Sequence, residues 1–237
     1  MPDSFPLSDR LLRSLMGTFT HDLRNPLSAI VSNLDFASRM AAQSNLDPDL
    51  VEALTDSVAA CDLFRRILAN LDVVAAAEPA ARVETAPIGP LVTEAAKRCA
   101  AQADQAGLTI TVIGGDAPLK AQVDKLNFAL GVENLVANSV THAPQGSEVT
   151  VTIEGTAEQV MVHLADRGPA IPAELHEVAV SPTGQTASGR QNGSRYARGV
   201  SLLAAHLIAQ LCGGSLSLGA DEGGSRFTLT VPRSTDG

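Results

Sequence analysis

The residue best suited to chemistry in this sequence is His21, in the stretch FTHDLRNPLSAI. In a helix, His21 would be turned by about 200° from both Phe19 and Leu23, so it faces outward when they face inward. Asp22 is adjacent, and Asn25 lies one turn later on the same outward side. An exposed imidazole can attack a phosphorus centre while a carboxylate takes the proton of its other nitrogen, and an amide can orient a water for hydrolysis. An ordinary surface histidine fits the same position.

A second set of polar residues occurs in ENLVANSVTHA, within a segment expected to be helical over residues 124–142. Asn134 and Asn138 are four residues apart, so they share one face of that helix, with Glu133 beside them. Amide and carboxylate oxygens are hard ligands suited to Mg²⁺, which keeps waters and binds phosphate. Polar decoration of an amphipathic helix would produce the same pattern.

Two glycine-containing turns complete the set of candidates. Asp166 follows the β-rich run QVMVHLA, so its carboxylate lies at a strand end, where it can accept a hydrogen bond from an exocyclic amine. Gly168 would allow the backbone to approach a ring closely. Gly199 precedes a helix, whose free N–H groups suit a phosphate. An ordinary Asp-x-Gly turn would look the same around Asp166.

The elements that must position these residues fall into two parts. Apolar residues recur every three or four positions over 8–43 and again up to about 77, with turn chemistry at 44–49. This pattern predicts an antiparallel hairpin, and pairing two copies into a four-helix bundle would bury the apolar stripe. The remainder alternates strands and helices, with a helix over 91–106 that stops at Gly107 and a final hairpin ending in FTLTVP, which predicts an α/β sandwich. We therefore expect an α+β protein with a hairpin over 1–78, a linker over 79–86 and a second domain over 87–237.

Composition excludes several classes of function. The net charge of -9 and the lack of a basic run argue against nucleic acid as a partner. No apolar stretch is long enough to predict a membrane span, and the N-terminus does not resemble a signal peptide. These features predict a cytoplasmic protein, and any signal it responds to would come from a separate sensory protein, unless its activity is constitutive.

The run HDLRNPL resembles the H-box of sensor histidine kinases, which lies on a dimerisation hairpin. ENLVANSVTHA, DRGPAI and the region from Gly199 onward resemble, in order and spacing, the N-box, G1 box and G2 box of the same family's ATP-binding domain. Together these motifs cover about residues 10–232. The resemblance implies that His21 is the phosphoacceptor, Asp22 its acid/base partner, and Asn25 the residue used to dephosphorylate a partner.

For the nucleotide site, the resemblance implies ATP and Mg²⁺ as cofactors. It makes Asn138 the Mg²⁺ ligand, with Glu133 and Asn134 as its neighbours. It makes His142 an adenine-side contact and Asp166 the reader of the adenine amine. The resemblance implies a homodimer that phosphorylates His21 from ATP. The phosphoryl group would then pass to an Asp of a response-regulator receiver domain.

The sequence departs from the family pattern in its nucleotide motifs, and the family's phenylalanine-containing F-box is missing from residues 172–198. Thr141 stands where the family has Lys, Ala170 replaces the second Gly of the G1 box, and ARGVSL replaces a glycine-richer G2 box. These losses leave two alternatives open. One is an ATP-independent phosphotransferase or phosphatase, and the other is a scaffold without catalysis.

Overall fold

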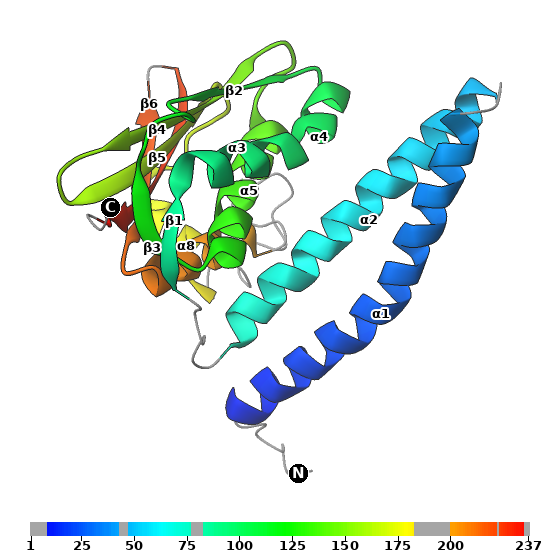
Figure 1. The fold of residues 1–237 in the computed structure, drawn as a ribbon, viewed down its shortest axis with the longest axis horizontal. Helices are drawn as coiled ribbons and strands as arrows, with labels where there is room; N and C mark the ends of the chain where they lie inside the picture. The colour runs from blue at the N-terminus through cyan, green and yellow to red at the C-terminus, as the bar shows by residue number, and fades with distance from the viewer. Residues whose placement is uncertain (1–8, 43–46, 77–82, 183–199, 222, 235–237) are drawn as a thin grey trace. The chain divides into compact units, whose positions relative to one another are not determined.

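The computed structural model describes residues 9–42, 47–76, 83–182, 200–221 and 223–234. The chain divides into two compact units, with the boundary between Glu78 and Pro79. Figure 1 shows the first unit as a pair of long helices and the second as a sheet with helices. In the part of the chain that the structure describes, no helix is long and apolar enough to cross a membrane.

The first unit is the predicted helical hairpin. Helix α1 (Asp9–Ala42) runs past Pro26 without ending, and α2 (Pro48–Ala75) lies alongside it. The start of α2 follows from its sequence, because the Asp47 side chain accepts a hydrogen bond from the Asp49 N–H at 3.0 Å and Pro48 takes the first helical position. The predicted helices over 8–43 and up to about 77 are confirmed within one or two residues at their described ends.

The two helices pack through a narrow seam. On α1, Thr20, Leu27 and Ala41 are buried at positions separated by multiples of seven, the repeat of a coiled-coil contact. Phe19, Leu23 and Ile30 remain 64%, 44% and 50% exposed. The sequence stripe that was expected to face inward is therefore only partly buried within one chain, which corrects the inward placement of Phe19 and Leu23.

The second unit is built on a five-stranded sheet in the order β2-β4-β5-β7-β6. Its strands are β2 (Thr109–Ile113), β4 (Glu148–Gly155), β5 (Gln159–Asp166), β6 (Ser215–Asp221) and β7 (Gly224–Pro232). Only the β2–β4 pair is parallel. A second small sheet pairs β1 (Glu84–Pro87) with β3 (Lys120–Val123), so the expected linker over 79–86 overlaps the start of β1.

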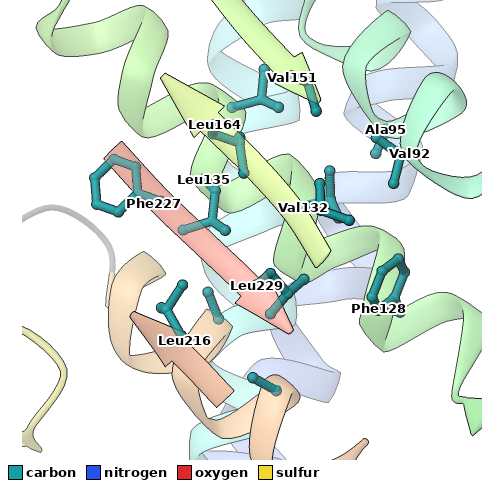
Figure 2. Close-up of a cluster of buried hydrophobic side chains, with 14 of the residues drawn as sticks. Val92, Ala95, Phe128, Val132, Leu135, Val151, Leu164, Leu216, Phe227 and Leu229 are labelled. Atoms are coloured by element: carbon teal, nitrogen blue, oxygen red, sulfur yellow. The ribbon is translucent and has the colours of Figure 1, made fainter. Parts of the chain in front are cut away.

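One face of the large sheet is covered by helices. These are α3 (Ile88–Arg98), α4 (Ala100–Gln105), α5 (Lys125–His142) and α8 (Ser201–Leu211). The short helices η1 (Ala173–Leu175) and α6 (His176–Ala179) follow β5 in the sequence. Alternate strand residues such as Leu164, Phe227 and Leu229 are fully buried beneath them, and Leu135 of α5 meets them from the helix side (Figure 2). The predicted α+β class, with a hairpin followed by an α/β sandwich, is confirmed.

The helix expected over 91–106 differs from the prediction. The chain forms two helices, α3 and α4, with a break at Cys99, whose φ and ψ are −91° and −2°. The first of them begins three residues earlier, directly after Pro87. Gly107, with φ of +67°, follows the end of α4, as the sequence indicated.

Candidate functional site

His21 lies on the surface of the hairpin, with 73% of its side chain exposed. Its Nδ1 is 3.4 Å from Oδ1 of Asp22, whose side chain is 69% exposed. This contact uses Nδ1, so Nε2 is the ring nitrogen left for a reaction with an external group. Asn25 is also exposed, one turn further along α1. All three sequence candidates on this helix are therefore accessible to a partner.

The turn that carries His21 is attached to α2 by residues that the sequence motif did not reveal. The Thr20 hydroxyl donates a hydrogen bond to Oδ1 of Asp72 at 2.5 Å, and the Arg24 guanidinium donates to Oδ2 of the same carboxylate. Thr20 is 2% exposed, although it directly precedes the exposed His21. Asp72 could not be identified from the sequence motif, because it lies 52 residues from Thr20 along the chain.

The two asparagines of the second candidate set are interior residues. Asn134 is 1% exposed and Asn138 is 7% exposed, on one side of α5. Burying an amide costs free energy unless its polar atoms find partners, so simple surface decoration is wrong as an interpretation. Their oxygens are of the type that Mg²⁺ prefers, and Asn138 is the more exposed of the two.

Glu133 has a different environment from the asparagines. Its Oε2 lies 3.8 Å from Nη1 of Arg98 at the end of α3. Nearby on α5, the Oγ1 of Thr141 accepts a hydrogen bond from the side chain of Gln102 of α4 at 3.3 Å. Glu133 and Thr141 therefore face the helices α3 and α4, and the structure gives Glu133 a cationic partner that the sequence did not predict.

Asp166 ends β5 and is 4% exposed. Its Oδ1 accepts a hydrogen bond from the Gly168 N–H at 2.8 Å, which holds the carboxylate in the turn that the sequence singled out. Ser225 of β7 lies directly opposite Asp166 in the sheet register. The Ser225 hydroxyl is buried and has no hydrogen-bond partner among the residues that the structure describes. Such an orphaned polar atom beside a buried carboxylate fits a site that holds a polar ligand or water.

Sequence reasoning missed Ser225, although a signal for it exists. In SRFTLTVP the inward positions alternate, and Ser225 occupies the position that Phe227, Leu229 and Val231 fill with apolar side chains. A serine at a buried strand position has to satisfy its hydroxyl, which marks it as a candidate for binding.

Two candidates remain, His142 and Gly199. His142 is the last residue of α5 and its Nε2 is buried. Gly199 lies outside the described residues. The next residue, Val200, precedes α8 with φ of 51°, a left-handed conformation that is rare for a β-branched side chain. Burial lowers the pKa of His206 within α8, so this side chain carries no charge at neutral pH.

The second unit thus combines a buried carboxylate at a strand end, a pair of interior amides on α5 and the start of α8. Residues 123–235 match the family described as histidine kinase-, DNA gyrase B- and HSP90-like ATPase. This part of the chain is similar to the ATPase domains of that family, and the chain as a whole is similar to proteins named sensor histidine kinases.

Three of these relatives match almost the whole chain. The sensor protein DivL of Caulobacter vibrioides is 26% identical over 95% of this chain. The sensor-like histidine kinase SenX3 of Mycolicibacterium smegmatis is 24% identical over 94%, and the probable sensor histidine kinase TcrY of Mycobacterium tuberculosis is 26% identical over 95%. The chain spans 28%, 58% and 46% of the lengths of these relatives, respectively.

Solved structures show the same fold. Full-length ShkA, solved in complex with AMPPNP, aligns with a TM-score of 0.64 at 19% identity, over 94% of this chain and 46% of that chain. The catalytic domain of histidine kinase ThkA aligns with a TM-score of 0.56 at 20% identity, over 64% of this chain and 96% of that chain.

Proposed function

We propose that this chain is a protein histidine kinase that phosphorylates His21 from Mg-ATP and passes the phosphoryl group to an Asp of a response-regulator receiver domain. The observation that carries the proposal is the presence, in one chain, of an exposed histidine with a carboxylate at its Nδ1 and an ATPase-family domain with a buried Asp at a strand end. The kinase names of relatives that match over nine tenths of the chain support it.

The reaction at His21 follows from its two nitrogens. Asp22 orients the imidazole through Nδ1, so Nε2 attacks the γ-phosphorus of ATP. The N–P bond forms as the bond from phosphorus to the β–γ bridging oxygen breaks, and ADP leaves. The Asp22 carboxylate accepts the Nδ1 proton, which removes the positive charge from the ring. A receiver carboxylate then attacks the same phosphorus, and the N–P bond breaks as the new O–P bond forms. The ring takes its proton back from Asp22, which regenerates neutral His21.

The nucleotide would be held in the second unit. Asp166 would accept a hydrogen bond from the adenine amine, with Gly168 and the Ser225 hydroxyl beside it. Asn138, with Asn134 as its neighbour, would hold Mg²⁺, which supplies charge neutralisation to the phosphates when bound. Gly199 and the start of α8 would face the phosphates, as the resemblance implies, and His142 would contact the adenine.

The active form is proposed to be a homodimer. Within one chain α1 leaves Phe19 and Ile30 exposed, and α2 leaves Leu63 and Phe64 49% and 39% exposed. Large apolar side chains gathered on one hairpin are the usual mark of an interface, and a second hairpin would complete a four-helix bundle. Cytoplasmic location and a separate sensory partner stay predictions from the sequence.

The proposed activity is tested by incubating the purified dimer with γ-labelled ATP, with and without Mg²⁺. Label that is stable to base, lost in acid and dependent on Mg²⁺ is the expected result. The Asn138→Ala variant is expected to reduce the initial rate by about 100-fold or more, since phosphoryl transfer depends mainly on positioning and charge neutralisation. No label on a folded dimer would contradict the kinase. Label accepted instead from a phosphorylated receiver would then identify the phosphotransferase alternative.

Replacing Asp166 tests the proposed nucleotide site separately from the phosphorylation of His21. In Asp166→Asn one carboxylate oxygen becomes an NH₂ donor, while the other can still accept from Gly168 N–H. Two donors would then face each other at the adenine amine, so we expect the Kd for ATP to rise about 100-fold, the size of a lost charge-assisted hydrogen bond with its desolvation penalty. Titration calorimetry measures the Kd for ATP of both proteins.

The matched control for this variant is Asp221→Asn. Asp221 is exposed near the end of β6 and lies 3.5 Å from Arg226. Its replacement changes the net charge equally but should leave the Kd within about twofold, because a surface ion pair contributes little. Equal affinities for both variants would remove Asp166 from the proposed site.

A further inference from the structure

The geometry points to Asp72 as a positioning residue for His21: its carboxylate fixes the turn of α1 that presents the imidazole. This inference rests on the proposed function, because His21 is taken as the phosphoacceptor. Asp72 does not touch His21. It acts through Thr20 and Arg24, which lie on either side of His21 in the sequence and whose side chains contact Asp72.

Both oxygens of the Asp72 carboxylate are used by α1. Oδ1 accepts from the Thr20 hydroxyl at 2.5 Å, and Oδ2 accepts from the Arg24 guanidinium. Thr20 and Arg24 are four residues apart, so the carboxylate spans one complete helical turn. A single contact would leave α1 free to roll about its axis, whereas two contacts along the axis restrict both its rotation and its sliding.

The bracketed turn contains His21. On a helix, His21 is displaced by about 100° from Thr20 and about 60° from Arg24. When these two residues face α2, the imidazole must project sideways from the hairpin, in agreement with its 73% exposure. A slip of one residue at the Asp72 contact would turn the imidazole by about 100°, away from the direction of attack.

The burial of Thr20 makes this arrangement specific. The hydroxyl is 2% exposed, and a buried hydroxyl without an acceptor is costly. Its other neighbouring acceptor is the carbonyl of Gly17 at 2.9 Å, within its own helix. The Gly17 carbonyl keeps the hydroxyl paired in any rotation of α1, so the preference comes from the Asp72 carboxylate, which can accept from Thr20 in one rotation only. The contact to Asp72 therefore selects a single rotation of α1 against α2.

The two contacts of Asp72 with α1 also differ in their exposure to water. The Arg24 side chain is 50% exposed and that of Asp72 is 37% exposed, so an isolated ion pair between them would be weak. The Thr20 contact lies inside the seam and is shielded from water. The combination, rather than the ion pair alone, is what we expect to hold the turn in place.

The test uses Asp72→Asn in the full chain, with a charge exchange, Arg24→Asp with Asp72→Arg, as the rescue. Asp72→Asn is expected to lower kcat for His21 phosphorylation about tenfold or more and to leave the KM for ATP unchanged, because the nucleotide site is in the other unit. Amide hydrogen exchange in residues 18–25 should quicken at least tenfold. The charge exchange should recover at least half of each loss, because a guanidinium on α2 can donate both to the exchanged carboxylate on α1 and to the Thr20 oxygen, while the Thr20 hydroxyl donates to the Gly17 carbonyl.

Asp62→Asn is the matched control. Asp62 lies on α2 and pairs with Arg65 of the same helix at 3.5 Å. Its replacement therefore removes the same charge without breaking a contact between α1 and α2. It should leave kcat, KM and the exchange rates unchanged. A purely structural role for Asp72 would lower the melting temperature and the folded fraction without a split between kcat and KM, and would overturn the proposal.

Hydrogen exchange separates the failure of this inference from failure of the proposed function. If the wild-type chain takes no label from ATP, the kinase proposal fails. Faster exchange over residues 18–25 in Asp72→Asn would still support the inference that Asp72 fixes this turn of α1. If exchange in that variant equals that of the wild type, Asp72 does not hold the turn, whatever the labelling result.

Discussion

Replacing His21 with Ala is expected to abolish phosphorylation of this chain, reducing acid-labile label by at least about 1000-fold, the scale of loss when a covalent nucleophile is removed. No neighbouring side chain can take over its role, because Asp22 and Asn25 supply oxygen and amide groups and not a second imidazole. The measurement is single-turnover transfer from γ-labelled ATP, followed by acid treatment.

The stability and nucleotide affinity of the same variant should be unchanged. His21 has 73% of its side chain exposed and only a long contact to Asp22, so its truncation should alter the free energy of unfolding by less than about 0.5 kcal/mol. The Kd for ATP should also stay constant, since the binding residues lie in the second unit. Label persisting on His21→Ala at the wild-type level would assign the phosphoacceptor to another of the five histidines.

Much of the fold could be predicted because its local signals are strong. The three-and-four spacing of apolar residues identified α1 and α2, and the alternation in QVMVHLA and FTLTVP identified β5 and β7. Asp166 could be placed at a strand end because the apolar alternation stops there and an Asp-x-Gly turn follows.

The features that were missed depend on contacts between distant residues. The break at Cys99 has neither Gly nor Pro to announce it, and it allows α3 and α4 to follow the surface of α5. The partners Arg98 for Glu133 and Asp72 for Thr20 are each more than 30 residues away in sequence. Periodicity gives the face on which a residue lies, but it does not identify the residue opposite.

Periodicity also overstated the burial of the hairpin. It placed Phe19, Leu23 and Leu27 on one stripe, yet only Leu27 is buried in a single chain. A stripe wider than one neighbouring helix can cover is what a four-helix bundle requires, so the breadth of the pattern contained information about assembly as well as about the fold.

Gly224→Ala is expected to destabilise the second unit and to weaken nucleotide binding together. A Cβ at Gly224 would lie 1.7 Å from the backbone oxygen of Asp166 and 2.9 Å from Cα of Arg167. Neither is the end of a flexible side chain, so β5 and β7 must separate where Asp166 and Ser225 are paired. Backbone overpacking of this kind should cost about 3 kcal/mol, or about 6–12 °C in Tm for a unit of this size.

Two other glycines separate the steric effect from the effect on binding. At Gly214 a Cβ would meet the Thr230 oxygen at 1.8 Å, five residues along β7 from Ser225 and so about 17 Å away. Gly214→Ala should lower Tm similarly while leaving the Kd for ATP of the folded protein unchanged. Gly219→Ala, whose nearest neighbour atom would be 3.9 Å away, should alter neither. Calorimetric melting and ATP titration on all three variants decide the matter. If Gly224→Ala raised Kd no more than Gly214→Ala did, the backbone at Asp166 would not form part of the nucleotide site.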